Sequence, residues 1–303
     1  MSRLRKTFGS PREAAMRFGA PLLFLVAVIA LWDLAVVRGW IEALILPRPG
    51  DIATAFVDLL GTDDIAGHFL ATLWETVAGF LVGSALGIAL AIASAVSVFL
   101  RQMLYPYVVA LQVTPRIALA PIIIAWLGFG YSPKIVIAAT IVFFPVFINA
   151  LTGMVSVDRD AIEMFRSMGA SRRQTFLHLR LPSALPVTFA GLKTGLTLAL
   201  IGAIVGEFIS AEKGLGLLIQ TYSFQVNMAS AMAVLILLTL MGFALYGLME
   251  LLDRVLVFWS HDARMAVRTR RRAASAAKRR RNMHSAGAAM AASPAHTRDV
   301  MRP

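Results

Sequence analysis

The chain has 303 residues, of which 58% are hydrophobic and 15% are charged, and its formal net charge is +12. Soluble globular domains carry about 25% charged residues, so this composition excludes an ordinary soluble domain and predicts helices of about 20 residues each that span a bilayer. The absence of cysteine excludes a disulfide framework, a thiol nucleophile and a cysteine-ligated metal, and the five histidines form no H-x-x-x-H pair. We therefore expect no metal site, no cofactor and no catalytic residue.

The apolar sequence divides into six segments. The first follows a basic stretch, residues 1–19; it is too long for a signal peptide and no A-x-A cleavage pattern follows it, so we interpret it as a retained first transmembrane helix. In the third segment, Pro115, Arg116 and Pro121 predict a kinked or partly unwound helix. Between the first two segments, turn residues lead into a short amphipathic helix on the membrane surface. The segments are 20–38, 69–98, 104–127, 134–155, 184–208 and 229–252.

The distribution of basic residues predicts the orientation of these segments. With the N-terminus inside, 23 lysines and arginines lie on the cytoplasmic side and 4 lie outside. This predicts an all-α polytopic membrane protein with six transmembrane helices and both termini in the cytoplasm. The basic tail, residues 259–303, has no apolar period, so we expect a disordered cytoplasmic end that contacts anionic lipid. Its arginines are not interleaved with aromatic residues, which disfavours nucleic-acid binding.

A basic segment, residues 156–183, separates the fourth and fifth apolar segments. Asp160 and Glu163 have the spacing of a capping box, Gly169 is placed to end that helix, and Ser171 with Gln174 predicts a second capped helix. Pro182 is expected to end the second helix. Apolar side chains recur at helical spacing: Ile162, Phe165 and Met168, then Phe176 and Leu179. The segment is therefore either a structured connection or, as its exposed apolar residues favour, a docking surface for a soluble partner.

At this segment the sequence resembles the EAA loop of permease subunits of binding-protein-dependent ABC importers, E-A-A-x3-G-x9-I-x-L-P. Glu163 falls on the family's Glu, Gly169 on its Gly, Leu179 on its Ile, and Leu181-Pro182 on its Leu-Pro, while Met164 and Phe165 replace the two alanines. The stretches TLWETVAGFLVGSALG, TPRIALAPIIIAWLGFGYSPK, LPSALPVTFAGLKTGL and VGEFISAEKGLGLLI look like the nitrate/sulfonate/taurine branch of this family. The resemblance covers about residues 47–258.

The resemblance implies a type I ABC importer permease fold in the cell inner membrane, with its transmembrane domain at residues 65–258 and a first helix at 20–38 added to it. The implied partners are cytoplasmic ABC ATPase subunits, a periplasmic or lipid-anchored substrate-binding protein, and a second permease copy. The chain has no Walker A sequence, so ATP hydrolysis would belong to the separate ATPase subunit. By this resemblance the coupling residues are Glu163, Phe165, Gly169, Ala170, Ser171, Arg172, Phe176, Leu179, Leu181 and Pro182.

Charged and small residues within the apolar segments suggest further roles. Charges inside spans are usually functional or paired, so Glu75, Arg116, Lys193 and Glu207 could line the translocation path, or the two basic residues could pair with Glu75 or Glu207 or reach the membrane surface. Glycines four residues apart in the second and fifth segments favour packing within one subunit over a subunit interface.

Two further questions stay open in the sequence. An oxoanion, sulfonate or taurine is the favoured substrate, and a pyrimidine or vitamin precursor is the alternative. An ion-coupled secondary transporter would use Glu75 and Glu207 as proton or sodium sites. A membrane-embedded enzyme is disfavoured, because the sequence shows no Ser-His-Asp set and no carboxylate pair.

Overall fold

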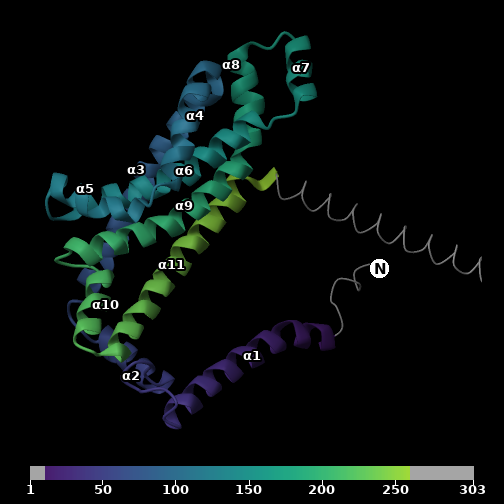
Figure 1. Cartoon of the computed structure of the whole chain (residues 1–303). Helices are drawn as coiled ribbons and strands as arrows, with labels where there is room; N and C mark the ends of the chain where they lie inside the picture. The colour runs from purple at the N-terminus through teal and green to yellow at the C-terminus, as the bar shows by residue number, and fades with distance from the viewer. Residues whose placement is uncertain (1–10, 260–303) are drawn as a thin grey trace, which may run out of the picture. The chain divides into compact units, whose positions relative to one another are not determined.

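A computed structural model describes residues 11–259, and within this range every regular element is a helix. The first ten residues and most of the predicted basic tail, 260–303, lie outside the described residues. The chain divides into two compact units after Glu250, and the helices that carry the candidate site lie in the first. The α-helices (Figure 1) are α1 (Pro11–Val37), α2 (Pro49–Leu60), α3 (Ile65–Val96), α4 (Val98–Val113), α5 (Ala120–Leu127), α6 (Tyr131–Val155), α7 (Arg159–Ser167), α8 (Arg172–Thr175), α9 (Leu181–Ser210), α10 (Leu215–Phe224) and α11 (Met228–Leu256).

The membrane-spanning helices agree with the six predicted segments. Five helices are long and apolar enough to cross a bilayer, and α4 with the segment 116–127 makes a sixth span bent by 88°. The bend confirms the predicted interruption of the third segment. Thr114 precedes a proline and Pro115 has no N–H to donate, so both residues take extended conformations and the helix cannot continue. A short 3-10 turn follows, and Pro121 then lies in the first turn of α5, where a proline is tolerated.

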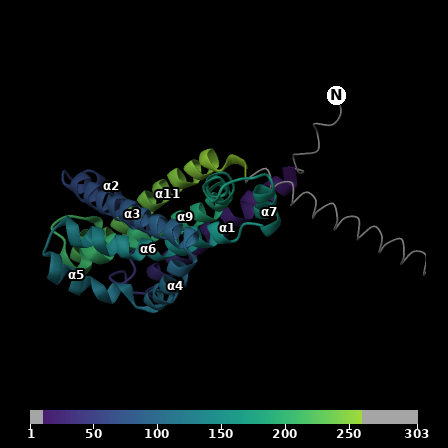
Figure 2. The same cartoon turned by 90° about the horizontal axis from the view of Figure 1, so that it is seen from above.

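Helix α6 lies between α3 and α9, and these three helices form the centre of the bundle (Figure 2). Small residues allow the close approach. A Cβ added at Gly83 of α3 would lie 2.5 Å from the Ala139 carbonyl oxygen of α6, and one at Gly202 of α9 would lie 2.8 Å from the Ala138 Cα. The glycine stripes therefore pack within this chain, as the sequence favours.

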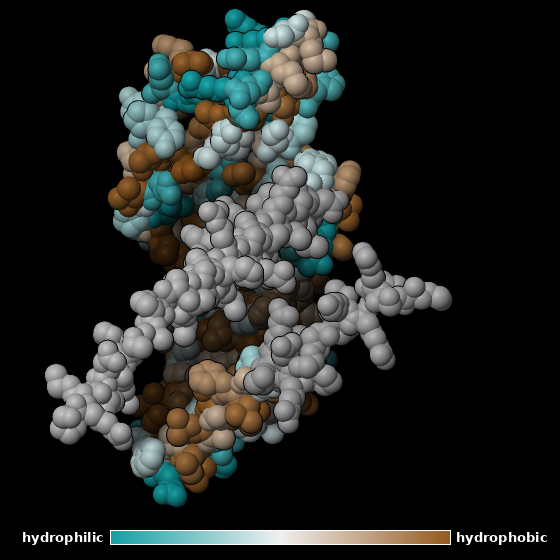
Figure 3. Space-filling view, turned by 90° about the vertical axis from the view of Figure 1, so that its right-hand side faces the viewer, coloured by the Kyte–Doolittle hydropathy of each residue, from teal (hydrophilic) through white to brown (hydrophobic). Residues whose placement is uncertain are grey.

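The outer surface of the helices is apolar along their middle. In the view of Figure 3, hydrophilic residues are concentrated near the top, and hydrophobic residues make up much of the visible surface below them. Large side chains such as Phe24, Leu81 and Leu86 are more than half exposed. Water would make this exposure unfavourable, whereas lipid would not, so the pattern is the one expected of a membrane protein. A short helix is present at the predicted place as α2, which buries Ile52 and Leu59 on one face.

Candidate functional site

The loop module, residues 156–183, begins with the short helix α7. Its N-cap is Asp158, whose side chain accepts a hydrogen bond from the Asp160 N–H at 3.1 Å. The prediction that Asp160 caps this helix was therefore wrong: the helix starts one residue after Asp158, and Asp160 lies in its first turn. No residue of α7 is buried, and Met164 and Met168 are 55% and 78% exposed. Helix α7 thus presents apolar side chains to its surroundings beside charged ones.

Gly169 makes the turn that the sequence predicts. Its φ is +79°, and the hydrogen bonds from its N–H to the Arg166 carbonyl and from the Ala170 N–H to the Phe165 carbonyl close the end of α7. A Cβ at Gly169 would meet no atom within 4 Å. The glycine is therefore required by the backbone conformation and not by lack of space.

The second half of the module starts with the predicted capping box. The Ser171 hydroxyl accepts from the Gln174 N–H at 3.2 Å, and the Gln174 side chain accepts from the Ser171 N–H at 2.8 Å. The helix does not end at Pro182, so that prediction was wrong. A π-helical turn, residues 176–180, joins α8 to α9, and Pro182 lies in the first turn of α9. Pro182 has no N–H to donate, and in the π turn before it the Leu181 N–H donates to the Phe176 carbonyl, so the chain continues as a helix.

The predicted coupling residues separate into two groups in the structure. Phe176 and Leu181 pack against a hydrophobic cluster that α3, α4 and α6 share with the start of α9. The other half-buried residues are Phe165, Ala170, Leu179 and Pro182, and the exposed ones are Glu163, Gly169, Ser171 and Arg172. The module is thus attached to the bundle by its second half and exposed at α7 and the glycine turn.

Two of the predicted path residues meet inside the bundle. Glu75 of α3 and Glu207 of α9 are neighbours with 0% and 1% exposure, and Glu75 forms an ion pair with Lys134 of α6. Thr72 donates a hydrogen bond to Glu207 at 2.6 Å. We call Thr72, Glu75, Lys134 and Glu207 the buried polar cluster. Lys134 was not among the predicted path residues; it lies three residues after Tyr131, where α6 begins.

The other two predicted path residues lie elsewhere and have partners of their own. Arg116 donates to the Ile141 and Gln112 carbonyls at 3.1 and 3.2 Å, and its guanidinium lies 5.0 Å from the centre of the Phe144 ring. Lys193 of α9 pairs with Glu250 of α11. Lys193 therefore has a carboxylate partner other than the expected Glu75 or Glu207, and Arg116 bonds to backbone carbonyls instead of a carboxylate. Glu250, a carboxylate inside the sixth apolar segment, was the signal that the sequence analysis missed.

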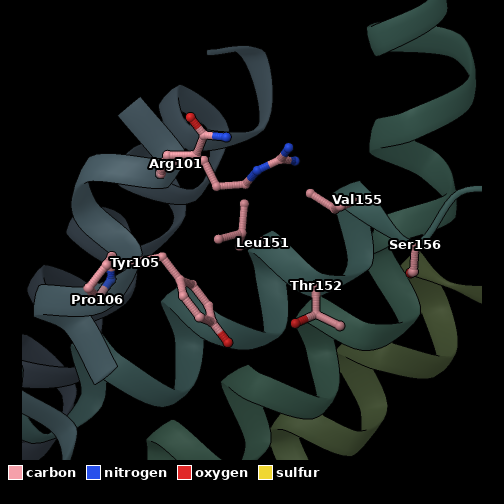
Figure 4. A pocket seen from close by; sticks show the side chains of 8 residues that line it. Arg101, Tyr105, Pro106, Leu151, Thr152, Val155 and Ser156 are labelled. Carbon is pink, nitrogen blue, oxygen red and sulfur yellow. The ribbon is translucent and has the colours of Figure 1, made fainter. Parts of the chain in front are cut away.

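A cavity of about 500 Å³ opens between α4 and α6, next to the start of the loop module (Figure 4). Its walls are mainly apolar, and the Arg101 side chain extends across it from α4. Its size lies within the range of small-molecule sites. The sequence analysis did not anticipate it. The lining residues are Arg101, Gln102, Tyr105, Pro106, Leu151, Thr152, Val155 and Ser156.

Comparison with known proteins gives a family match and similar permeases. Residues 83–257 match the family described as "Binding-protein-dependent transport system inner membrane component". The chain is 37% identical to the riboflavin transport system permease protein RibX of Chloroflexus aurantiacus, over 82% of this chain and 95% of that protein. It is 32% identical to the formylaminopyrimidine transport permease protein ThiX of Halalkalibacterium halodurans, over 79% and 95%. It is 33% identical to an Escherichia coli protein named for aliphatic sulfonates transport, SsuC, over 80% and 92%.

Among solved structures, the fold is similar to that of the MetNI methionine ABC transporter in inward-facing conformations. One crystal form gives a TM-score of 0.55 at 20% identity, over 62% of this chain and 93% of that chain. Another gives 0.52 at 21% identity, over 64% and 99%. At these identities the likeness concerns the fold alone.

Proposed function

Because this chain belongs to the family of binding-protein-dependent transport system inner membrane components, we propose that its loop module, residues 156–183, is the surface through which an ATPase drives it. The chain is an ABC importer permease of the type I fold and a multi-pass protein of the cell inner membrane. Permeases of this family work with an ATPase and a substrate-binding protein. An ion-coupled carrier is not needed to explain the two buried carboxylates, because Glu75 pairs with Lys134 and Glu207 accepts hydrogen bonds from Thr72 and the Gly216 N–H.

The observation that carries this proposal is the form of the loop module. A helix without any buried residue, a glycine turn at positive φ and a capped second helix make a preformed shape that exposes Met164 and Met168. A simple connection between two spans would not need this shape. Exposed apolar side chains at helical spacing beside charged ones are typical of a docking surface.

In this proposal both termini and the loop module lie in the cytoplasm, and two copies of the chain form the path between them. ATP binding draws two ATPase subunits together and moves the attached modules. Because α8 runs through the π turn into α9, and Ser156 directly ends α6, displacement of the module acts on both helices. The permease forms and breaks no covalent bond; it shifts the population between an inward-open and an outward-open state.

The substrate that we propose is a small heteroaromatic solute of the pyrimidine or vitamin-precursor class. RibX and ThiX are named for such compounds, whereas two SsuC proteins, of Escherichia coli and Bacillus subtilis, are named for aliphatic sulfonates. Within the described spans, Arg116, Lys134 and Lys193 are already engaged by carbonyl or carboxylate groups, so they offer little to a simple oxoanion. An aliphatic sulfonate, the compound class in the name of the third relative, is the alternative.

Purification from native membranes in mild detergent tests both proposals. We expect an ATPase with a Walker A sequence to co-purify with two copies of this chain. Recovery of the chain alone under several mild conditions would contradict the proposed docking surface. Mass spectrometry of small molecules retained by the co-purified binding protein then identifies the substrate class, and a retained sulfonate would overturn the heteroaromatic assignment.

A further inference from the structure

The turn between α9 and α10 is fixed by side chains from other parts of the bundle. Three consecutive backbone N–H groups each meet a side chain: Gly214 at 3.0 Å from His68 Nδ1, Leu215 at 2.8 Å from Thr72 Oγ1, and Gly216 at 2.6 Å from Glu207 Oε2. These amides lie at the start of α10, where a helix has unsatisfied donors and favours a negative charge. The turn therefore depends on α3 and α9 for its hydrogen bonds.

The same carboxylate joins this turn to α6. Glu207 accepts from Thr72 and from Gly216 and lies beside Glu75, which pairs with Lys134 of α6. Lys134 is 2% exposed, so the whole set is shielded from solvent. Removal of one partner from a buried ion pair destabilises the fold by much more than the intact pair stabilises it. A change at one member of the set therefore affects its neighbours, as expected of residues that share one buried hydrogen-bond network.

The position of the cluster relates it to the loop module. Lys134 lies near the N-terminal end of α6, and Glu207 near the C-terminal end of α9. The other ends of these two helices enter and leave the loop module. With 25 and 30 residues, the helices are about 37 and 45 Å long at 1.5 Å per residue. The module and the cluster therefore lie at opposite ends of the same two helices.

We propose that the buried polar cluster holds α10 to α6 and α9, so that movement of the loop module is passed to the turn before α10 on the far side of the membrane. Thr72, Glu75, Lys134 and Glu207 are positioning residues in this scheme and do not contact the solute. The inference rests on the proposed docking of an ATPase at the loop module. It adds a specific route by which the loaded substrate-binding protein at the outer face of the membrane changes ATP hydrolysis at the cytoplasmic face.

Glu207→Gln tests this route in the complex of permease, ATPase and binding protein in proteoliposomes. The amide keeps the size of the side chain but loses the charge and one of the two acceptor oxygens. We expect the basal ATPase rate to stay within about twofold, and its stimulation by the loaded binding protein to fall about tenfold, within the 5- to 150-fold range usual for coupling between sites. Glu250→Gln is the matched control: it removes the charge from the Lys193 ion pair between α9 and α11, and Glu250 lies near the C-terminal end of α11, whereas α10 precedes the N-terminal end of α11.

A second readout follows α10, the helix that begins at this turn. The chain has no cysteine, so Gln225→Cys at the exposed end of α10 can be spin-labelled at a single position. In the parent, trapping the ATPases in the closed state should change the spectrum of the label. In Glu207→Gln, trapping should leave the spectrum unchanged while the ATPase remains bound. If Glu207→Gln fails to insert into the membrane, Thr72→Val can replace it, with Thr188→Val as its control. The ATPase stimulation and the label spectrum are then compared in the same way, and the side-chain change is smaller.

The outcomes separate this inference from others. Normal stimulation by both Glu207→Gln and Thr72→Val would overturn it. Equal losses of basal rate, stimulation and melting temperature in Glu207→Gln and Glu250→Gln would also overturn it, because the cluster would then act only as a stabiliser. A parent complex with no bound ATPase would contradict the proposed function instead.

Discussion

Replacement of Gly169 by valine is the most direct perturbation of the loop module. Gly169 has φ of +79° with no atom within 4 Å of an added Cβ, so the cost is conformational. An L-residue in the left-handed region costs about 1–2 kcal/mol, and a β-branched residue is a stronger outlier there. The two hydrogen bonds that close α7 contribute about 0.5–1.5 kcal/mol each if they are lost. The low end of this sum, about 2 kcal/mol, already lowers the ratio of the native turn to its alternatives about 30-fold.

The transmembrane helices do not depend on this turn, so Gly169→Val should insert normally. We expect the variant to lose most of its co-purifying ATPase, and ATP-dependent uptake in proteoliposomes to fall with it. Gly39→Val is a matched control, because Gly39 also has a positive φ, of +71°, and open space around its Cβ position but lies outside the module. Uptake by Gly169→Val at the wild-type rate would refute the docking role.

Two further predictions concern the packing of the bundle. Lys134→Met leaves the buried Glu75 carboxylate without its cation, which should destabilise the fold by about 3–5 kcal/mol; adding Glu75→Gln should recover most of the loss in a detergent melting assay, and no recovery would mean that Lys134 acts through other contacts. Gly83→Ala should lower the melting temperature, at a cost of about 1–3 kcal/mol, because its Cβ would lie 2.5 Å from the Ala139 carbonyl. Gly247→Ala, where the Cβ meets nothing within 4 Å, should not lower it.

The features that were predictable from the sequence are local ones. The apolar segments, the positive-φ turn at Gly169 and the capping box at Ser171 each depend on residues within a few positions of one another. The continuation of the helix through Pro182 was not predictable, since it depends on a π turn that a pattern of residues does not reveal. The pairing of Lys134 with Glu75 was also missed, because the two are 59 positions apart and only the packing of α3 against α6 brings them together.

The π turn has a mechanical consequence. Because it joins α8 to α9 without a break, residues 172–210 form one apolar helical stretch of 39 residues, about 58 Å long at 1.5 Å per residue. The hydrocarbon core of a bilayer is about 30 Å thick, so close to half of this stretch extends beyond it. This protruding part packs through Phe176 and Leu181 against the cluster of α3, α4 and α6, so tilting the helical stretch by about 5° displaces its tip by several ångströms and moves these contacts with it. A small motion of an attached protein at that tip is then sufficient to turn the helix within the bilayer.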